Sequence, residues 1–294
     1  MPSAALLETI QLHLQRVASG DITEISDELV EEFGELCKGA LKRRYQDGRK
    51  DREFRLRMSN IGRPLGQLQR EKNGVSREGN SYAVPFRNLF GDLIEAAAIV
   101  TMKAAGVNVQ SQDEAVELDI GGMNLKGTYD IEIDSGIYDI KSASPYAFTK
   151  KFTGFMAVNE EDTFGYVSQG YMYSEASQKP FMGWIVINKA TGEWTVVNTP
   201  AADERYRAKV IADAEETIYI MNNDVTPWSC CCEPEDELFR KKATGNKKLG
   251  FSGSYCAYKH SCYPGIRYLP SQCSAGKNPA HYWYTEVTNE RKPT

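Results

Sequence analysis

The informative absences in this sequence are long apolar runs, a net positive charge, and cysteine over most of the chain. No run of about 18 apolar residues occurs, so we expect no transmembrane helix and no membrane partner. Residues 1–17 carry acidic and polar side chains where a signal peptide needs a basic start and an apolar block, which predicts an amphipathic helix in a cytoplasmic protein. The net charge of −5 argues against a protein that is basic over its whole surface.

One basic segment departs from this average. Between Lys38 and Arg77 the chain has thirteen Lys and Arg residues but only four Asp and Glu residues. Such a run is either a solvated helix face or a track that follows the phosphates of a nucleic acid. With 294 residues, of which 41% are hydrophobic, the chain can bury a large core in one or two domains.

Six of the seven cysteines fall in the last quarter of the sequence: Cys230, Cys231, Cys232, Cys256, Cys262 and Cys273. In a reducing compartment this clustering favours a metal site or buried thiols over disulfides.

The order of expected elements predicts an α/β protein with a mixed central β-sheet flanked by helices. Helices are expected to begin at Ser26, Ser144 and Asp162, and a buried helix should span residues 87–106. Strands are expected at about 115–120, 124–134, 137–143, 180–188 and 193–198, and a further helix at 201–221. We divide the chain into a helical, basic region at 1–80, a core at 81–222, and an irregular Cys-rich tail at 223–294 that packs on the core.

Residues 127–144, GTYDIEIDSGIYDIKSAS, form the most unusual stretch. Their alternation predicts a β-hairpin that turns at Ser135-Gly136, with Glu132 opposite Asp139 and Asp130 opposite Lys141. These four side chains would share one face, and the apolar residues would share the other. Carboxylates at cross-strand distance repel each other unless a cation lies among them. The alternative is an exposed hairpin with an ordinary Asp–Lys pair.

Two helices add polar residues to this picture. Glu95 lies on the apolar helix before the sheet, where a charge is costly unless it is paired or binds metal, and Gly91 leaves room for substrate one turn earlier. Gln169 and Tyr173 are spaced i, i+4 and share a helix face, from which both can hydrogen-bond a phosphate or a base.

Taken in order, Glu95, Asp130, Asp139-Ile140-Lys141 and Gln169-x-x-x-Tyr173 resemble the PD-(D/E)XK nuclease superfamily. They look most like its RecB-like branch, which includes CRISPR spacer-acquisition nucleases and many tailed-phage exonucleases. The resemblance covers roughly residues 85–190 and implies a restriction-endonuclease-like sheet. One departure is that relatives often have a helix histidine as a further metal ligand, whereas Gly91 stands about there in this chain.

The resemblance also implies roles for these residues. Glu95, Asp130, Asp139 and the backbone carbonyl of Ile140 would bind Mg²⁺ or Mn²⁺, and Lys141 would be the catalytic lysine. Gln169 and Tyr173 would position DNA. In the basic, DNA-contacting region, Arg63 is a candidate phosphate clamp.

The tail sequence GNKKLGFSGSYCAYKHSCYPG resembles a segment whose cysteines help to hold an iron–sulfur cluster. Cys256 and Cys262 match two of its positions, whereas Gly253 and Gly66 stand where further cysteines are expected. Cys230, Cys231 or Cys232, together with Cys273, could substitute in a cluster or a Zn²⁺ site. The alternative is unmetallated thiols.

The resemblance therefore implies a metal-dependent DNA exonuclease that acts on the ends of linear double- or single-stranded DNA. Its setting would be phage or prophage recombination, in the host cytoplasm if it is phage-encoded. Homo-oligomers, or a single-strand annealing or helicase partner, would fit that setting. The alternatives are a structure-specific or nicking endonuclease of the same fold, a catalytically decayed DNA-binding or assembly module, and an interaction protein organised by zinc or a cluster.

Overall fold

The computed structural model describes residues 3–46, 54–77, 83–160, 162–225, 232–274 and 276–290. The chain divides into two compact units. Unit 1 contains Met1–Gly62 and Ser81–Tyr219, and unit 2 contains Arg63–Asn80 and Ile220–Thr294. Each unit is thus built from two separate stretches of chain, whereas the sequence suggested three consecutive regions.

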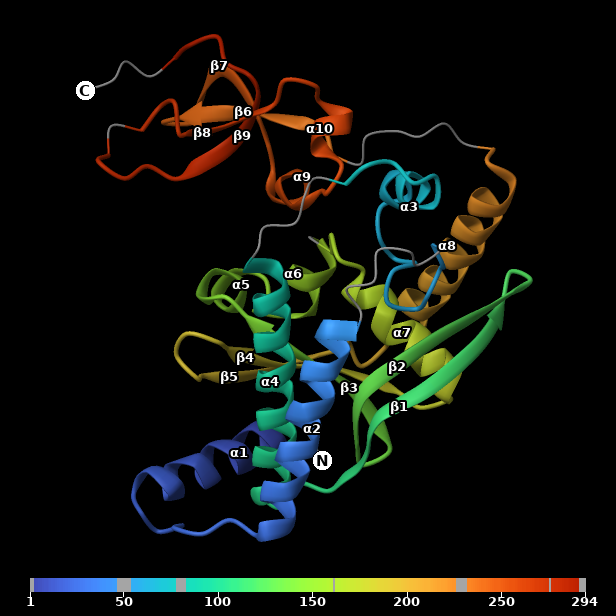
Figure 1. Cartoon of the computed structure of the whole chain (residues 1–294), viewed down its shortest axis with the longest axis vertical. Helices are drawn as coiled ribbons and strands as arrows, with labels where there is room; N and C mark the ends of the chain where they lie inside the picture. The colour runs from blue at the N-terminus through green and yellow to red at the C-terminus, as the bar shows by residue number, and fades with distance from the viewer. Residues whose placement is uncertain are drawn as a thin grey trace. The chain divides into compact units, whose positions relative to one another are not determined.

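A five-stranded mixed sheet forms the centre of unit 1 (Figure 1). The β3–β4 pair is parallel, and the other neighbouring pairs are antiparallel. The expected mixed sheet flanked by helices is therefore confirmed. The strands, in their spatial order, are β1 (Val109–Ile120), β2 (Met123–Ile133), β3 (Gly136–Ala143), β4 (Phe181–Asn188) and β5 (Trp194–Asn198).

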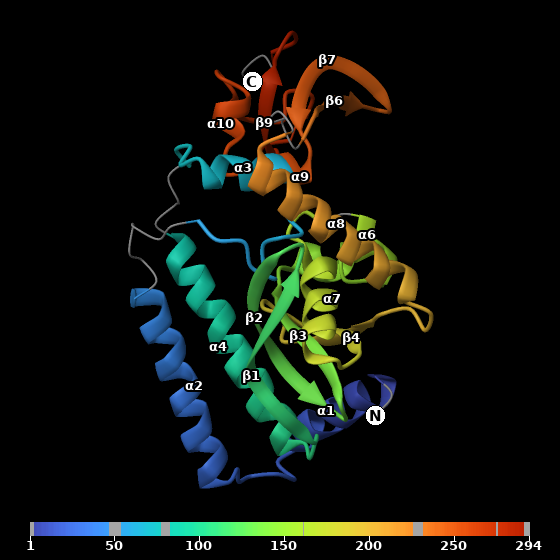
Figure 2. The ribbon, with the colours of Figure 1, turned by 90° about the vertical axis from the view of Figure 1, so that its right-hand side faces the viewer.

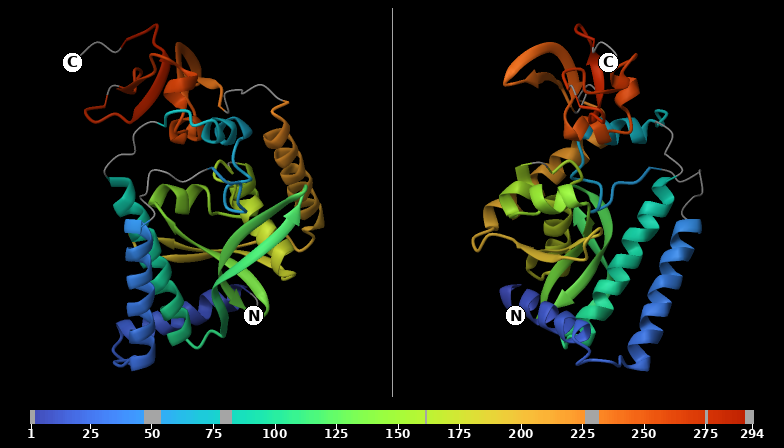
Figure 3. Two further views of the ribbon diagram at one scale, coloured as in Figure 1. Left: turned by 45° about the vertical axis from the view of Figure 1, so that its right-hand side comes forward. Right: turned by 90° about the vertical axis from the view of Figure 1, so that its left-hand side faces the viewer.

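Helices cover both faces of this sheet. On one face α1 (Ser3–Ala18) and α4 (Ala83–Ala104) bury apolar side chains against β2, β3 and β4, and α2 (Asp27–Gln46) packs along α4 (Figure 2). On the other face α7 (Tyr166–Ser177) contacts the first four strands (Figure 3). The remaining helices are α5 (Pro145–Lys150), α6 (Phe155–Glu160) and α8 (Glu204–Asn223), whose last residues belong to unit 2.

Side-chain caps fix three of these helix starts, as the sequence predicted. The hydroxyl of Ser26 accepts a hydrogen bond from the backbone N–H of Leu29 at 3.4 Å, and Ser144 caps α5 through Ala147 N–H at 3.2 Å. Asp162 accepts from the first two amides of α7 at 2.7 and 2.8 Å. These bonds satisfy amides that have no partner within the helix.

The hairpin turn lies one residue earlier than predicted. Asp134 and Ser135 form it with φ angles of 49° and 63°, so that Glu132 pairs with Ile137 and not with Asp139. Gly136 belongs to β3 and pairs with Ile133, and a Cβ atom there would meet Met182 Cγ at 2.4 Å. The partner of each residue therefore shifts by two positions, and residues 131–140 keep the predicted faces, because side chains alternate with a period of two. Tyr129, which the alternation would put on the apolar face, instead contacts Glu132 and Lys179.

The apolar face of the hairpin confirms this. Ile131, Ile133, Tyr138 and Ile140 are buried in one core cluster with residues of α1 and α4.

Unit 2 contains a second sheet, so the tail is more regular than predicted. Its strands run in the order β6 (Pro234–Phe239), β7 (Lys242–Leu249), β9 (His281–Glu286) and β8 (Arg267–Pro270). The sequence PEDELF of β6 is highly charged, and cross-strand ion pairs such as Lys247–Asp236, at 3.2 Å, hold it to β7. The unit also contains α3 (Leu65–Lys72), α9 (Phe251–Tyr255) and α10 (Lys259–Cys262). Within the described ranges, every helix is too short or too polar to cross a bilayer.

Candidate active site

The strands β2 and β3 stop pairing where the acidic residues begin. Counted from the turn, the last pair of their ladder is Ile131 with Tyr138. The next residue is Asp130 in β2 and Asp139 in β3. Asp130 Oδ2 accepts a hydrogen bond from the backbone N–H of Ile140 at 2.7 Å. A side chain thus satisfies this amide, and the two acids lie at an opening in the sheet.

Asp139 is the most deeply buried acid of the group, with 3% of its surface exposed. Lys141 Nζ lies 2.5 Å from Asp139 Oδ2. Apart from this ion pair, neither carboxylate oxygen of Asp139 has a hydrogen-bond partner among the described residues. Because a buried carboxylate normally accepts several hydrogen bonds, Asp139 depends on Lys141 for the compensation of its charge.

Glu95 approaches the same opening from α4. Burial, together with the neighbouring carboxylate of Asp113, raises the pKa of Glu95 to about 7, while Lys141 opposes the rise. One turn earlier on α4, a Cβ atom at Gly91 would lie 3.5 Å from Ser142 Oγ, which is ordinary contact. A methyl group would therefore fit at Gly91, and the use of this space by a substrate stays a prediction.

Charge repulsion and burial act together on this cluster. Burial raises the pKa of Asp130 well above its ordinary value, and the carboxylates of Asp139 and Glu95 add to the rise. Burial likewise raises the pKa of Asp139, although Lys141 lowers it. Burial alone would lower the pKa of Lys141, but Asp139 and Asp130 raise it above its usual range. Lys141 is therefore a protonated ammonium at neutral pH.

Gln169 and Tyr173 face this cluster from α7. Gln169 Nε2 donates to the Tyr173 hydroxyl at 3.0 Å, so the two side chains share one face of the helix as predicted. Burial raises the pKa of Tyr173 to about 12, and the charges of Asp139 and Asp130 contribute to that rise. The structure thus brings together Glu95, Asp130, Asp139, Lys141, Gln169 and Tyr173 in unit 1.

Sequence reasoning missed Tyr166 and Asp113. The ammonium of Lys141 lies 5.0 Å from the centre of the Tyr166 ring, and Lys151 Nζ lies 4.6 Å from it. Asp113 has a φ of 51°, which a sequence pattern does not reveal. The sequence offered one signal for Asp113, namely that it is an acid in the strand next to β2, which carries Asp130.

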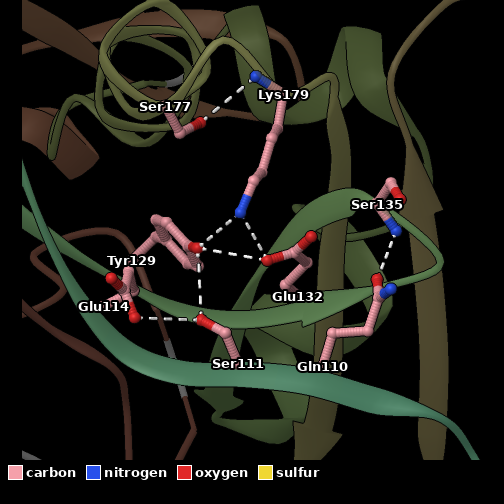
Figure 4. A network of polar contacts seen from close by, with 8 residues as sticks. All are labelled: Gln110, Ser111, Glu114, Tyr129, Glu132, Ser135, Ser177 and Lys179. Atoms are coloured by element: carbon pink, nitrogen blue, oxygen red, sulfur yellow. Dashed lines mark hydrogen bonds and ion pairs between the residues drawn. The ribbon is translucent and has the colours of Figure 1, made fainter.

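Glu132, which shares the face of Asp130, has a different partner from the one expected. Lys179 Nζ lies 2.6 Å from Glu132 Oε2 and 3.2 Å from the hydroxyl of Tyr129, which itself contacts Ser111 (Figure 4). Lys179 follows α7 in the chain, so this pair ties the end of that helix to β2. The ion pair already neutralises Glu132.

The donor set suits a hard cation, because carboxylate oxygens are the ligands that Mg²⁺ and Mn²⁺ prefer. The buried oxygens of Asp139 without hydrogen bonds support this fit. Among the described residues, however, no three acids, histidines or cysteines are arranged as a ready metal-binding group. Lys141 supplies the positive charge beside Asp139 instead. The Ile140 carbonyl as a ligand stays a prediction.

The remaining predicted residues belong to unit 2. Arg63 is its first residue, and contact with a phosphate stays a prediction. Cys232, Cys256 and Cys262 line one small pocket with Gly253, and a Cβ atom at Gly253 would lie 3.1 Å from Cys232 Cβ. Cys232 therefore lies next to the position where the resemblance expects another cysteine. Cys230 and Cys231 lie outside the described residues, and a cluster or zinc site stays a prediction.

No protein-family model and no curated protein matches the chain. Among solved structures, the crystal structure of SSO0001 has a TM-score of 0.42 and 14% identity, covering 77% of this chain and 94% of that one. A protein from Eubacterium rectale, described as "Putative exonuclease", has a TM-score of 0.33 and 13% identity, covering 73% of this chain and 75% of its own. Likeness at this level establishes neither a family nor an activity for this chain.

Proposed function

We propose that this protein is a divalent-metal-dependent deoxyribonuclease that acts on the ends of linear DNA. The observation that carries the proposal is the buried pair of Asp139 and Lys141 at the opening between β2 and β3, next to Asp130 and Glu95. In the alternative, an ordinary Asp–Lys pair at the surface, both side chains would be exposed, whereas here burial raises the pKa of both Asp130 and Asp139.

The side chains of the site suggest a separate role for the lysine and for the acids. Lys141 keeps its proton at Nζ at neutral pH, so its role is to attract and orient a phosphate oxygen or a water molecule rather than to remove a proton. Glu95, Asp130 and Asp139 would hold Mg²⁺ or Mn²⁺, which when bound polarises the phosphate and activates water. The low exposure of Asp139 strengthens these interactions by excluding water.

The Gln169–Tyr173 pair supports DNA as the substrate. A hydroxyl and an amide on one helix face can hydrogen-bond backbone phosphates without reading the sequence. The preference for DNA ends over internal sites follows from the resemblance of this pair to RecB-like exonucleases, as does the setting in phage or prophage recombination.

Digestion of end-labelled linear DNA, double- and single-stranded, tests the proposal in Mg²⁺, Mn²⁺ and EDTA. We expect metal-dependent degradation by the wild type and at least a hundredfold loss of rate in Lys141→Ala and in Asp139→Asn, which is the usual scale for an electrostatic catalytic group. Lys126→Ala is a matched control, because Lys126 also lies on the hairpin but pairs with Glu117 at the surface.

The substrates separate the alternatives. Nicking of a closed circular plasmid at the rate of linear DNA would identify an endonuclease in place of an exonuclease. Binding of DNA without any cleavage, in all metals, would identify an assembly module on a nuclease-like site and would refute the proposed activity.

A further inference from the structure

The helix α2 has two apolar faces, one buried against the rest of unit 1 and one exposed to solvent. On the inner face Leu36 packs against the core cluster, and Ala40 has only 1% of its surface exposed. The outer face exposes between 38% and 81% of each of four large apolar side chains: Val30, Phe33, Leu41 and Tyr45. A surface helix normally presents polar residues on the side away from the core, so the second apolar face is unusual.

The exposed apolar residues form one continuous row along the helix. We call this row the α2 stripe, and it consists of Val30, Phe33, Cys37, Leu41 and Tyr45. Successive helical residues turn by about 100°, so the five positions fall within about 120° of each other around the helix axis. In Figure 2, α4 lies along one side of α2, and the opposite side faces away from the sheet. A contiguous exposed stripe, unlike scattered apolar residues, is typical of an interaction surface.

Charge is distributed unevenly along the same helix. The first nine residues of α2 contain five acids and no base, whereas the remaining eleven contain four bases and no acid. Two of these charges hold the helix within unit 1. Glu32 pairs with Lys103 of α4, and Arg44 Nε donates a hydrogen bond to Asp92 Oδ2 of α4 at 2.8 Å. Other charges of α2 lie beside the stripe and are exposed.

This distribution makes α2 complementary to a second copy of itself that runs in the opposite direction. If the two helices are centred on each other near Cys37, Glu31 of one copy lies opposite Lys42 of the other, and Glu35 lies opposite Lys38. The helical spacing puts these four exposed side chains along the same edge of the stripe. A parallel pair of helices would instead put acid against acid and base against base, which is unfavourable.

We propose that the α2 stripe is the interface of a two-fold symmetric homodimer, in which α2 packs antiparallel on α2 of a second copy. The apolar stripe would supply the buried area, and the charge pairs would fix the direction. Each contact occurs twice in a two-fold interface, so a helix that complements itself is sufficient. One helix from each copy gives a small interface, and we therefore expect a dissociation constant in the micromolar range. The inference does not depend on the proposed cleavage of DNA.

Sedimentation equilibrium of the full-length protein without DNA tests the inference. We expect the wild type to pass from monomer to dimer between about 1 and 100 µM, which brackets a micromolar dissociation constant. Leu41→Gln removes an apolar side chain from the stripe and keeps the helix propensity, so the dissociation constant should rise at least about tenfold. Leu12→Gln is the matched control, because Leu12 is 58% exposed on α1, outside the stripe. It should leave the dimer unchanged.

Reversal of one charge pair tests the direction of packing. Glu31→Lys and Lys42→Glu should each raise the dissociation constant about tenfold, because each puts like charges opposite each other at two places in the dimer. The double variant Glu31→Lys/Lys42→Glu should restore the wild-type affinity. This pair is preferred over Glu35 and Lys38, which already pair with each other within one helix at 2.9 Å. All the substituted positions are exposed, so circular dichroism should match that of the wild type in every variant.

A wild type that stays monomeric over the whole range, or a dimer that persists unchanged in Leu41→Gln, would overturn the inference. Loss of the dimer in both single charge variants without recovery in the double variant would also overturn it, because α2 would then contact a surface other than its own copy. Each of these outcomes leaves the proposed nuclease function standing, since none of them measures cleavage.

Discussion

Replacing Gly91 by Ala should make the protein more stable and less active. Gly91 lies inside α4, where Ala is favoured over Gly by about 1 kcal/mol. The added Cβ would lie 3.5 Å from Ser142 Oγ, its nearest neighbour, so no clash offsets this gain. A gain of about 1 kcal/mol corresponds to a rise in Tm of about 2–4 °C for a folding unit of this size.

The methyl group would also fill space one turn before Glu95 and next to Ser142, which follows Lys141 in β3. We therefore expect a higher KM for DNA. Gly34→Ala is the matched control, since Gly34 lies inside α2 and no atom would lie within 4 Å of its Cβ. It should raise Tm by a similar amount without changing cleavage.

Urea denaturation and steady-state cleavage of labelled DNA, measured on both variants, separate these effects. Destabilisation by Gly91→Ala would refute the packing argument at the contact between α4 and β3. Equal stabilisation with unchanged KM in both variants would refute the use of this space by the substrate.

Three further predictions concern packing and buried charge. Gly127→Ala should lower the free energy of unfolding by about 1–3 kcal/mol, measured by denaturation, because its Cβ would meet Tyr173 Cε1 at 2.5 Å. Displacement of Tyr173 should also weaken DNA binding, measured by fluorescence anisotropy, and an unchanged affinity would refute a contact between Tyr173 and DNA. Lys179→Met should lower the free energy of unfolding of unit 1, measured by urea denaturation, by about 1–3 kcal/mol, because the buried Glu132 loses its ion pair. The second substitution Glu132→Gln should restore most of this loss, and a double variant that stays equally unstable would contradict the role of the pair. Burial alone would raise the pKa of Glu237, but hydrogen bonds from Tyr284 and Asn246 lower it. The ionised form of Glu237 should therefore stabilise unit 2 above the unfolded pKa of about 4.3, and this stabilisation should be lost as the pH falls through the lowered folded pKa. In this acid range the Tm of Glu237→Gln should fall less steeply with pH than the Tm of the wild type, and equal slopes would contradict the assignment.

The order of elements and the polar face of the hairpin could be predicted because they depend on local pattern. Alternation identified β2 and β3, and the caps at Ser144 and Asp162 depend on short side chains next to helix starts. The i, i+4 spacing of Gln169 and Tyr173 follows from helix geometry alone.

What could not be predicted depends on contacts between distant residues. Asp134 and Ser135 form the turn, and Gly136 lies in the strand, where Met182 of another strand fills the space that its Cβ atom would need. In unit 2 the register of β6 shifts at Glu237, and the buried Glu237 accepts hydrogen bonds from Ser271 Oγ and Gln272 N–H at 3.1 Å. A buried acid at a bulge breaks the alternation by which a strand is recognised.

Diffraction from crystals soaked in Mn²⁺, with data collected for anomalous scattering, tests whether the acids of the hairpin bind a divalent cation. We expect an anomalous peak between Asp130 and Asp139, within reach of Glu95, with the ammonium of Lys141 moved away from Asp139. A contrary result would be a Lys141–Asp139 pair that stays intact, with no peak at the hairpin or with manganese bound elsewhere in the chain.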